Sequence, residues 1–246
     1  DGQTWTLCDA ATPGARSNHV LAYDDRRGVT VLFGGHDDEA RNGETWEWDG
    51  ATWILKSVTG PSPRCNAAMA FDSARGVMVL CGGDDGDLIG ETWEWDGLEW
   101  TFRTDGGPGR IRDHALAYDS DRGVTVLFGG WNGAYLGDTW EWDGTDWTYR
   151  KSEGPGPRLG HAMSYDSSRS RVVLYGGTDG SRNGETWTWD GNDWTPLDTA
   201  GPGRRYYHAM VYDGGRAAIV LFGGSLDGDR AIPTWELGRD RCPEIL

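Results

Sequence analysis

The heptapeptide Glu-Thr-Trp-Glu-Trp-Asp-Gly at residues 44–50 returns in identical form at residues 91–97. Variants of it begin at Asp138 and Glu185, and a shortened copy, Thr-Trp-Glu-Leu-Gly, occupies residues 234–238. The first tryptophan of each copy falls at positions 46, 93, 140, 187 and 235, so the spacing is 47 residues three times and then 48. A constant period of this length indicates a repeat architecture, and the five copies cover almost all of the 246 residues.

Each copy also carries a glycine pair and an aromatic-Asp pair at fixed places. The glycine pairs are Gly34-Gly35, Gly82-Gly83, Gly129-Gly130, Gly176-Gly177 and Gly223-Gly224. The aromatic-Asp pairs are Tyr23-Asp24, Phe71-Asp72, Tyr118-Asp119, Tyr165-Asp166 and Tyr212-Asp213, and each of them opens an Asp-x-x-Arg sequence. A polar pair repeated five times on a turn is interpreted as a structural clasp between the first two strands of each repeat.

The third copy illustrates how one repeat is expected to fold. Residues 114–119 and 124–130 form two apolar stretches on either side of an Asp-x-x-Arg turn, and residues 139–142 and 146–149 form two aromatic stretches around Asp-Gly. Alternation, β-branched residues and an Asp-Gly turn favour an antiparallel meander. Four strands in about 40–50 residues are typical of a propeller blade. We therefore predict an all-β fold, a five-bladed β-propeller of four-stranded antiparallel blades.

The order of these markers resembles the Kelch repeat, a family that includes the propeller domain of galactose oxidase. The resemblance rests on Arg-x-x-His, an apolar strand ending in Gly-Gly, an aromatic strand and a further tryptophan, and it covers residues 13–237. It implies a β-propeller with one repeat per blade. The copper site of galactose oxidase is not implied, because no equivalent set of Cys, Tyr and His is recognisable in this sequence.

We expect a single domain over residues 1–246. Residues 1–6, Asp-Gly-Gln-Thr-Trp-Thr, have the pattern of the fourth strand that the fifth repeat lacks, so residues 1–8 are predicted to close the last blade. The expected repeats span about residues 13–57, 61–104, 108–151, 155–198 and 202–238, followed by a tail over residues 239–246.

Composition excludes two classes of partner. With 23 Lys and Arg against 39 Asp and Glu, the net charge is −16, so a nucleic-acid backbone would be repelled. The longest apolar runs, such as residues 29–33, are too short to cross a bilayer, so we expect no membrane insertion. The chain does not open with a signal-peptide pattern, and its composition favours an extracytoplasmic or secreted location.

A Cys8–Cys242 disulfide could join the two ends, whereas Cys81 fits a small core residue and Cys65 lies near it without clear register.

Candidate metal ligands are interpreted as structural. His19, His114, His161 and His208 share one place in the repeat, where packing between blades competes with a transition-metal site at the propeller axis. Packing is favoured, because Kelch-like sequences often carry His at this place. The acidic loops at residues 37–39, 84–87 and 227–229 lack the ligand spacing of a calcium loop. No nucleophile elbow, phosphate loop or zinc motif is present, so we expect no cofactor and no metal, and name no catalytic residue.

Function is expected on the face that collects the linkers between blades and the loops after Gly-Gly. Strands alternate in direction, so the short, uniform turns share one face and these variable segments share the other. The candidate ligand-binding residues on the variable face are Arg16, Asn18, Arg64, Asn66, Arg110, Arg112, Trp131, Tyr135, Arg158, Arg205, Tyr206 and Tyr207. Of these, Arg112, Trp131, Tyr135, Tyr206 and Tyr207 are not required by the repeat. The arginine three residues before the repeat histidine has both a structural and a functional interpretation.

Two functions follow from this face. One is a non-catalytic module that recognises a protein or peptide, since Kelch-like propellers commonly bind partners here and Arg and aromatic residues suit such contacts. The alternative is a carbohydrate-binding or sugar-isomerising protein that acts on anionic sugars, similar to the Kelch-type sialic acid mutarotases. The absence of a paired-carboxylate arrangement favours the first.

Overall fold

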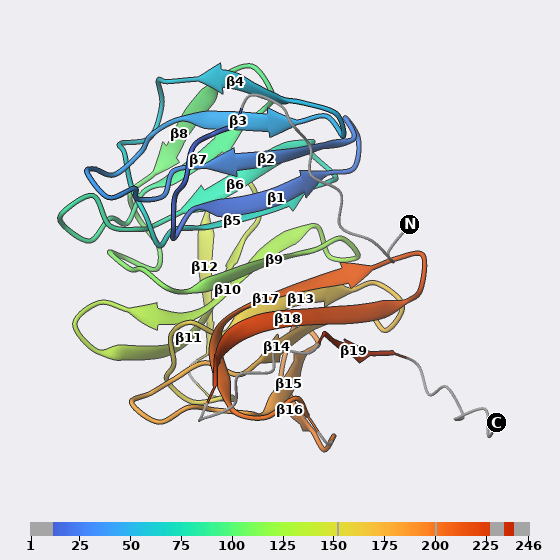
Figure 1. The fold of residues 1–246 in the computed structure, drawn as a ribbon. Coiled ribbons are helices and arrows are strands. Elements are labelled where there is room, and N and C mark those ends of the chain that lie inside the picture. The colour runs from blue at the N-terminus through green and yellow to red at the C-terminus, as the bar shows by residue number, and fades with distance from the viewer. Residues whose placement is uncertain (1–11, 152, 200, 227–233, 239–246) are drawn as a thin grey trace.

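The computed structural model describes residues 12–151, 153–199, 201–226 and 234–238, which form five antiparallel sheets (Figure 1). Each sheet corresponds to one repeat, and its strands follow one another in chain order. Blade one contains β1 (Val20–Asp24), β2 (Val29–Phe33), β3 (Thr45–Trp48) and β4 (Trp53–Ser57). Blade two contains β5 (Ala68–Asp72), β6 (Val77–Cys81), β7 (Thr92–Trp95) and β8 (Trp100–Thr104). Blade three contains β9 (Ala115–Asp119), β10 (Val124–Trp131), β11 (Tyr135–Trp142) and β12 (Trp147–Lys151).

Blade four contains β13 (Ala162–Asp166), β14 (Arg171–Tyr175), β15 (Thr186–Trp189) and β16 (Trp194–Leu197), and blade five contains β17 (Arg205–Asp213), β18 (Ala218–Leu226) and β19 (Trp235–Leu237). The predicted five-bladed β-propeller is therefore confirmed, with three strands described in the last blade. The predicted closing strand at residues 1–8 and the Cys8–Cys242 disulfide lie outside the described residues. None of the described segments forms a helix long and apolar enough to span a membrane.

In blades one to four, the glycine pair lets the second strand end in close contact with two linkers. In blade three, Gly129 and Gly130 have φ angles of 65° and 105°, which favour glycine. A Cβ on Gly129 would lie 2.6 Å from the carbonyl oxygen of Arg158, and one on Gly130 would lie 2.9 Å from that of Arg112. The two glycines thus hold blade three between its own linker and the linker of the next blade.

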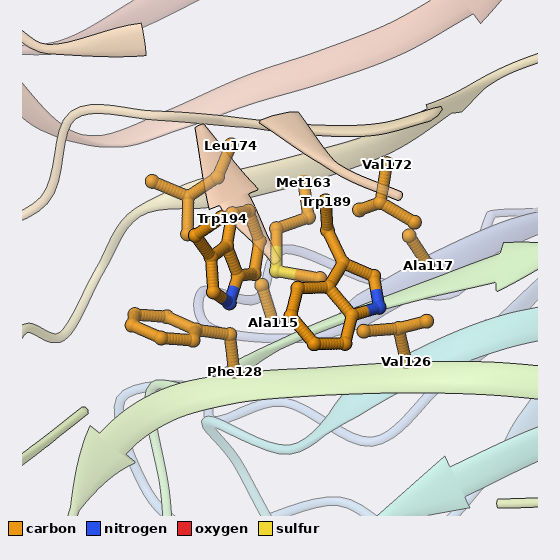
Figure 2. Close-up of a cluster of buried hydrophobic side chains, with 9 residues drawn as sticks. All are labelled: Ala115, Ala117, Val126, Phe128, Met163, Val172, Leu174, Trp189 and Trp194. Atoms are coloured by element: carbon orange, nitrogen blue, oxygen red, sulfur yellow. The ribbon is translucent and has the colours of Figure 1, made fainter. Parts of the chain in front are cut away.

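The hydrophobic core lies between neighbouring blades. Figure 2 shows the contact of blades three and four, where Trp189 and Trp194 pack against side chains from both sheets. The aromatic ring of Phe128, just before Gly-Gly, meets Trp194 edge-on at 5.2 Å between centroids. The other members of this cluster are Ala115, Ala117, Val126, Met163, Val172 and Leu174.

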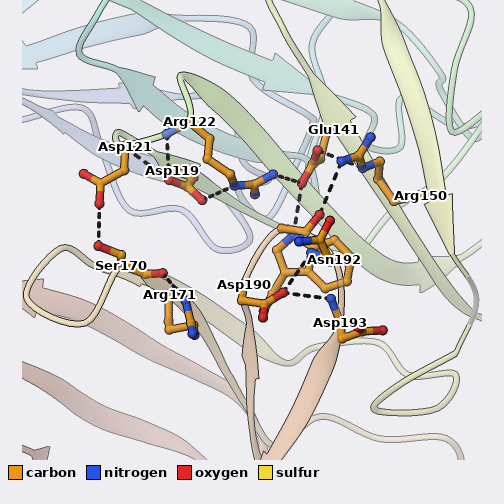
Figure 3. Close-up of polar contacts among 12 residues, drawn as sticks. Asp119, Asp121, Arg122, Glu141, Arg150, Ser170, Arg171, Asp190, Asn192 and Asp193 are labelled. Carbon is orange, nitrogen blue, oxygen red and sulfur yellow. Dashed lines mark hydrogen bonds and ion pairs between the residues drawn. The ribbon is translucent and has the colours of Figure 1, made fainter.

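A polar network joins the uniform turns to the core, and it begins at the predicted Asp-x-x-Arg clasp (Figure 3). In blade three, Arg122 Nε donates to Asp119 Oδ2 at 2.7 Å, and its Nη1 donates to Glu141 Oε1 at 2.6 Å. The same Glu141 oxygen accepts a 3.0 Å hydrogen bond from Trp189 Nε1 in blade four. The clasp is confirmed, and it extends beyond the first two strands to the third strand and the next blade.

The two described cysteines are free thiols. Cys81 is fully buried, as predicted for a core residue, and burial raises its pKa to about 12. Cys81 pairs in register with Ala68, while Cys65 lies earlier, in the linker before β5. Cys65 and Cys81 therefore form no disulfide with each other.

Candidate functional site

Two sets of contacts place the loops on opposite faces. The Asp-Gly turn of one blade approaches the Asp-x-x-Arg turn of the preceding blade, so that a Cβ on Gly191 would lie 2.9 Å from the Arg122 guanidinium. On the other face, linkers pair with the loops after Gly-Gly; for example, Arg112 and Trp131 exchange backbone hydrogen bonds of 2.9 and 3.1 Å. The linkers and variable loops therefore gather on one face, hereafter the loop face.

A chain of backbone hydrogen bonds surrounds the propeller axis on this face. One residue at the entry to each blade adopts a left-handed conformation, with φ between 55° and 63°: Asn18, Asn66, Asp113, Gly160 and Tyr207. From the second of them onward, each N–H donates to the carbonyl oxygen of the preceding member, at 3.0, 3.0, 2.9 and 2.7 Å. The predicted residues Asn18, Asn66 and Tyr207 thus belong to a ring of five residues that is hydrogen-bonded in series from blade one to blade five and borders an axial depression of about 310 Å³.

Asp113 is the charged group of this ring. Its Oδ1 accepts a 2.8 Å hydrogen bond from Asn66 Nδ2, and Arg112 Nε lies 3.7 Å from its Oδ2. Burial raises the pKa of the Asp113 carboxyl, and the positive charge of Arg112 opposes that shift. Burial and the Asp113 charge in turn raise the pKa of the Tyr207 phenol to about 12.

The repeat histidines pack between blades. His161 meets Phe128 of blade three edge-on at 5.5 Å, and His208 meets Tyr175 of blade four in the same way at 5.6 Å. Burial lowers the pKa of His114 to about 3 and that of His208 to about 4, so both rings are neutral at pH 7. Within the described ranges, no three His, Cys, Asp or Glu side chains are close enough together to hold a metal ion. These contacts support the structural interpretation of the repeat histidines.

Four of the predicted ligand-binding arginines are used inside the blades: Arg16, Arg64, Arg158 and Arg205. Each donates Nη1 to the carbonyl oxygen of the first glycine of its own Gly-Gly pair, at 2.9–3.2 Å. The Arg64 side chain is 0% exposed, and its Nη2 lies 2.6 Å from Glu91 Oε2. Burial supports the structural interpretation of these arginines, because a guanidinium enclosed within its blade does not face a ligand. In blade three, the buried Ile111 takes this place.

Arg110 and Arg112 lie in the linker before blade three. Arg110 is exposed, and it forms no ion pair with any described residue. Arg112 is held by two carboxylates, with Nη1 3.6 Å from Asp84 Oδ2 in addition to its approach to Asp113. Asp84 also receives a 2.7 Å hydrogen bond from Arg41 Nη2, so two arginines share this carboxylate on the loop face.

The variable loop of blade three is a regular hairpin. Its second and third strands, β10 and β11, run to eight residues each and continue past Gly-Gly to the pair formed by Trp131 and Tyr135. Their rings meet edge-on with centroids 5.0 Å apart. The hairpin thus places on the loop face two aromatic side chains that the repeat does not require, and the sequence predicts this position for both.

One depression joins the loops of three blades, and we call it the Tyr-Arg site. It measures about 530 Å³ and is lined by Tyr135 of blade three, Thr178, Gly180, Ser181 and Arg182 of blade four, and Arg204 and Tyr206 of blade five. The Arg182 guanidinium lies over the Tyr206 ring, 5.4 Å from its centroid, which is a cation–π geometry. The Tyr135 hydroxyl lies over Gly180, where a Cβ would be 3.9 Å away.

The Tyr-Arg site brings together only part of the predicted set. Tyr135 and Tyr206 line it, and Trp131 adjoins it through the Tyr135 ring. Arg110 and Arg112 lie on the loop face outside its lining.

The residues predicted from the sequence include Tyr135 and Tyr206 but not Arg182 and Arg204, which line the same depression. A signal for Arg204 exists, because its register matches Pro63 and Pro157 in other linkers. A proline at two equivalent positions indicates a side chain that the blade does not need for hydrogen bonds. Arg205, one residue later, is buried within its blade, as are Arg64, Ile111 and Arg158 in the same register.

The Tyr-Arg site offers guanidinium groups, phenol hydroxyls and aromatic faces, which suit recognition of a ligand with acidic and planar or apolar parts. The described residues that line it include no pair of carboxyl groups of the kind that acid–base hydrolysis of sugars uses. The sequence matches no model of a known protein family, and no curated protein is significantly similar to it. The function is therefore inferred from the geometry of the loop face.

Proposed function

We propose that this protein is a non-catalytic recognition module that binds a protein or peptide through the Tyr-Arg site. A propeller is consistent with a binding role, because its rigid blades present variable loops on one face. The single observation that carries the proposal is that Tyr135, Arg182, Arg204 and Tyr206 come from three blades and line one depression. Tyr and Arg are among the residue types that most often dominate binding energy at interfaces.

The resemblance to Kelch repeats supports the same role, since such propellers commonly bind partners on this face. The recognition role does not require a bound cofactor. We further propose an extracytoplasmic or secreted location, for which the composition of the chain is the support.

The second candidate is recognition of an anionic sugar. Its support is the combination of aromatic rings with arginine in the same depression, because sugars stack on aromatic faces and their carboxylates pair with guanidinium groups. Isomerisation of such a sugar would further need a positioned acid or base, and Tyr135, Thr178 and Tyr206 are the hydroxyl-bearing residues of the lining beside Ser181.

The test is a binding screen of the purified protein against a displayed library of random nonapeptides and against a glycan array. Tyr135→Ala and Tyr206→Ala should each weaken selected ligands tenfold or more. The control is Tyr149→Ala, because Tyr149 is an exposed tyrosine on the outer strand β12, away from the loops. Peptide binding with this pattern supports the proposal. Binding only to glycans supports the second candidate, and equal effects of all three substitutions contradict both.

A further inference from the structure

We infer that the Tyr-Arg site binds an extended acidic peptide and that Arg204 receives a carboxylate of that peptide. This inference rests on the proposed function and adds to it the chemistry and the direction of the ligand.

Arg204 provides the positive charge that is available to a ligand. Its side chain is exposed, it forms no ion pair with the described part of the chain, and its Cα and Cγ pack over Gly184, where a Cβ would be 3.2 Å from each. This contact fixes the base of the side chain, so less conformational entropy is lost when its guanidinium binds. Arginine binds carboxylates through two parallel hydrogen bonds, which gives geometric selectivity as well as affinity.

The long-range field of the protein does not favour an acidic ligand. With a net charge of −16, the chain as a whole repels anions, and salt screens this repulsion beyond roughly 10 Å. An acidic ligand must therefore gain its affinity from short-range contacts. Arg204 and the Arg182–Tyr206 pair, which line the same depression, provide such contacts.

A second depression of about 400 Å³ continues from the Tyr-Arg site and favours a chain-like ligand. The two depressions share Ser181, Arg182 and Arg204. The second one extends along Asn183, Gly184 and Glu185 and along Gly201 and Gly203. Together they form a track on either side of Arg182 and Arg204, which suits several residues of an extended peptide better than a single sugar ring.

The track has a direction because its two ends differ in charge. Among the described residues that line it, the end near Tyr135 and Tyr206 carries no acidic side chain. The other end carries Glu185, whose exposed carboxylate accepts hydrogen bonds from Arg158 Nη2 at 3.2 Å and Trp187 Nε1 at 3.0 Å. A like charge opposite Glu185 would be unfavourable. The acidic residue of the peptide is therefore placed at the tyrosine end, and a neutral or basic residue lies near Glu185.

The chain offers a matched control for Arg204 in Arg110. Both arginines lie four residues before the repeat histidine of their blade, and both are exposed. Their backbones also pack alike, since a Cβ on Gly90 would lie 3.2 Å from the Arg110 nitrogen and one on Gly184 would lie 3.1 Å from the Arg204 nitrogen. Arg110 lines neither of the two depressions, so it tests whether any exposed arginine of this register suffices.

The experiment compares Arg204→Ala with Arg110→Ala. A library of random nonapeptides is selected on the wild-type protein, and the affinity of individual selected peptides is measured for each variant by titration. We expect Asp or Glu to be enriched at one end of the selected sequences. Arg204→Ala should weaken their binding at least tenfold, Arg204→Lys should restore part of it, and Arg110→Ala should leave it within twofold. Equal melting temperatures of the variants show that folding is intact.

The outcomes separate this inference from the proposed function. If peptides bind at the Tyr-Arg site without acidic enrichment, and Arg204→Ala behaves like Arg110→Ala, the inference is overturned while the recognition role stands. If no peptide binds and anionic glycans bind in an Arg204-dependent way, the inference of a peptide ligand is overturned, and recognition of an anionic sugar is supported instead. If nothing binds that Tyr135→Ala or Arg204→Ala weakens, the proposed function and the inference both fail.

Discussion

The indole nitrogen of Trp142 donates a 3.0 Å hydrogen bond to Oε1 of Glu94, a residue of the preceding blade that lies 48 positions earlier in the chain. Both side chains are almost completely buried. The same bond joins Trp95 to Glu47 at 3.1 Å and Trp189 to Glu141 at 3.0 Å. The recurring Trp-Glu-Trp sequence therefore supplies both the donor and the acceptor of a hydrogen bond between blades. The glutamate of one repeat accepts the bond from the second tryptophan of the next repeat.

Glu94→Gln should lower the free energy of unfolding by about 1–3 kcal/mol. The Glu94 carboxylate accepts hydrogen bonds from Arg75 at 2.5 Å, Arg103 at 2.7 Å and Trp142, so a neutral amide that donates on one side cannot satisfy all three donors. The effect is limited because the two arginines are about one-third exposed. Denaturant titration measures it, and the exposed Glu99→Gln is the control. Equal midpoints for the two variants would contradict the stabilising role of the network.

Arg64→Ala should lower the free energy of unfolding by about 3 kcal/mol. This value is at the low end of the destabilisation that is typical when a buried ion pair loses one partner, because the Glu91 side chain is about one-third exposed. The substitution removes bonds to Glu91 and to the Gly82 carbonyl oxygen. Arg204→Ala, at an exposed arginine, is the control and should stay within about 0.5 kcal/mol of the parent. If Arg64→Ala leaves stability unchanged and instead abolishes ligand binding, the structural interpretation of the buried arginines is wrong.

Trp5→Ala should lower the free energy of unfolding by about 3–5 kcal/mol. A cavity of about 70 Å³ between blades four and five is lined in part by Tyr175, Thr186 and Gly201. In the preceding junction the equivalent residues surround Trp194, whose Nε1 donates to Thr139 at 2.9 Å. Because β19 has only β18 as a neighbour among the described strands, a strand from residues 1–8 would supply the matching tryptophan there.

Gln3→Ala serves as the control for Trp5→Ala, since the equivalent Ala51 of blade one is exposed in its turn. Deletion of residues 1–7 should destabilise the protein further and promote association through the exposed edge of the last blade. Unfolding curves and size-exclusion chromatography measure both effects. A Trp5→Ala variant that melts like the parent would refute the closing strand.

Stability should fall as the pH is lowered from 7 to 5. The pKa of His114 is about 3 and that of His208 about 4 in the folded protein, below the ordinary 6.5, and that of His161 is lowered as well, in each case chiefly by burial. The unfolded chain therefore binds more protons below pH 6.5, which favours unfolding. Each such histidine adds a slope of up to about 1.4 kcal/mol per pH unit.

The measurement is the free energy of unfolding at several pH values between 7 and 5, above the range in which most carboxylates titrate. His161→Gln should reduce the slope, whereas substitution of the exposed His36 by Gln should leave it unchanged. A flat profile for the parent protein would show that the repeat histidines are not held neutral by the fold.

Trp131→Ala should weaken binding of a selected ligand by about 2 kcal/mol, because its ring packs against Tyr135, and change stability by about 0.5 kcal/mol or less. Arg169→Ala, on the opposite face, should do the reverse, because Arg169 pairs with the buried Asp166 and donates to the Gly238 carbonyl oxygen at 2.7 Å. Melting curves measure the stability of both variants, and titrations measure their affinity for the ligand. A strongly destabilised Trp131→Ala, or a ligand that depends on Arg169, would show that the loop face is the wrong place for function.

Much of the fold follows from the sequence alone, because each repeat contains the local signals for its own strands. The Asp-x-x-Arg turn, the Gly-Gly pair and the Asp-Gly turn each have a local physical reason to form. Five copies of these signals at a constant spacing predict a five-bladed propeller. The spacing also predicts the two loop faces, since strand alternation fixes on which side each loop lies.

The tertiary structure alone decides which side chains are available to a ligand. Arg204 and Arg205 are neighbours of the same type, yet Arg204 is exposed in the Tyr-Arg site while Arg205 is 1% exposed and donates to the Gly223 carbonyl oxygen at 3.0 Å. Likewise, Tyr135 and Tyr206 are 71 positions apart and line the same depression only because blade four holds blades three and five around it. Burial and proximity of this kind depend on the packing of one blade against the next, which no local pattern within a single repeat encodes.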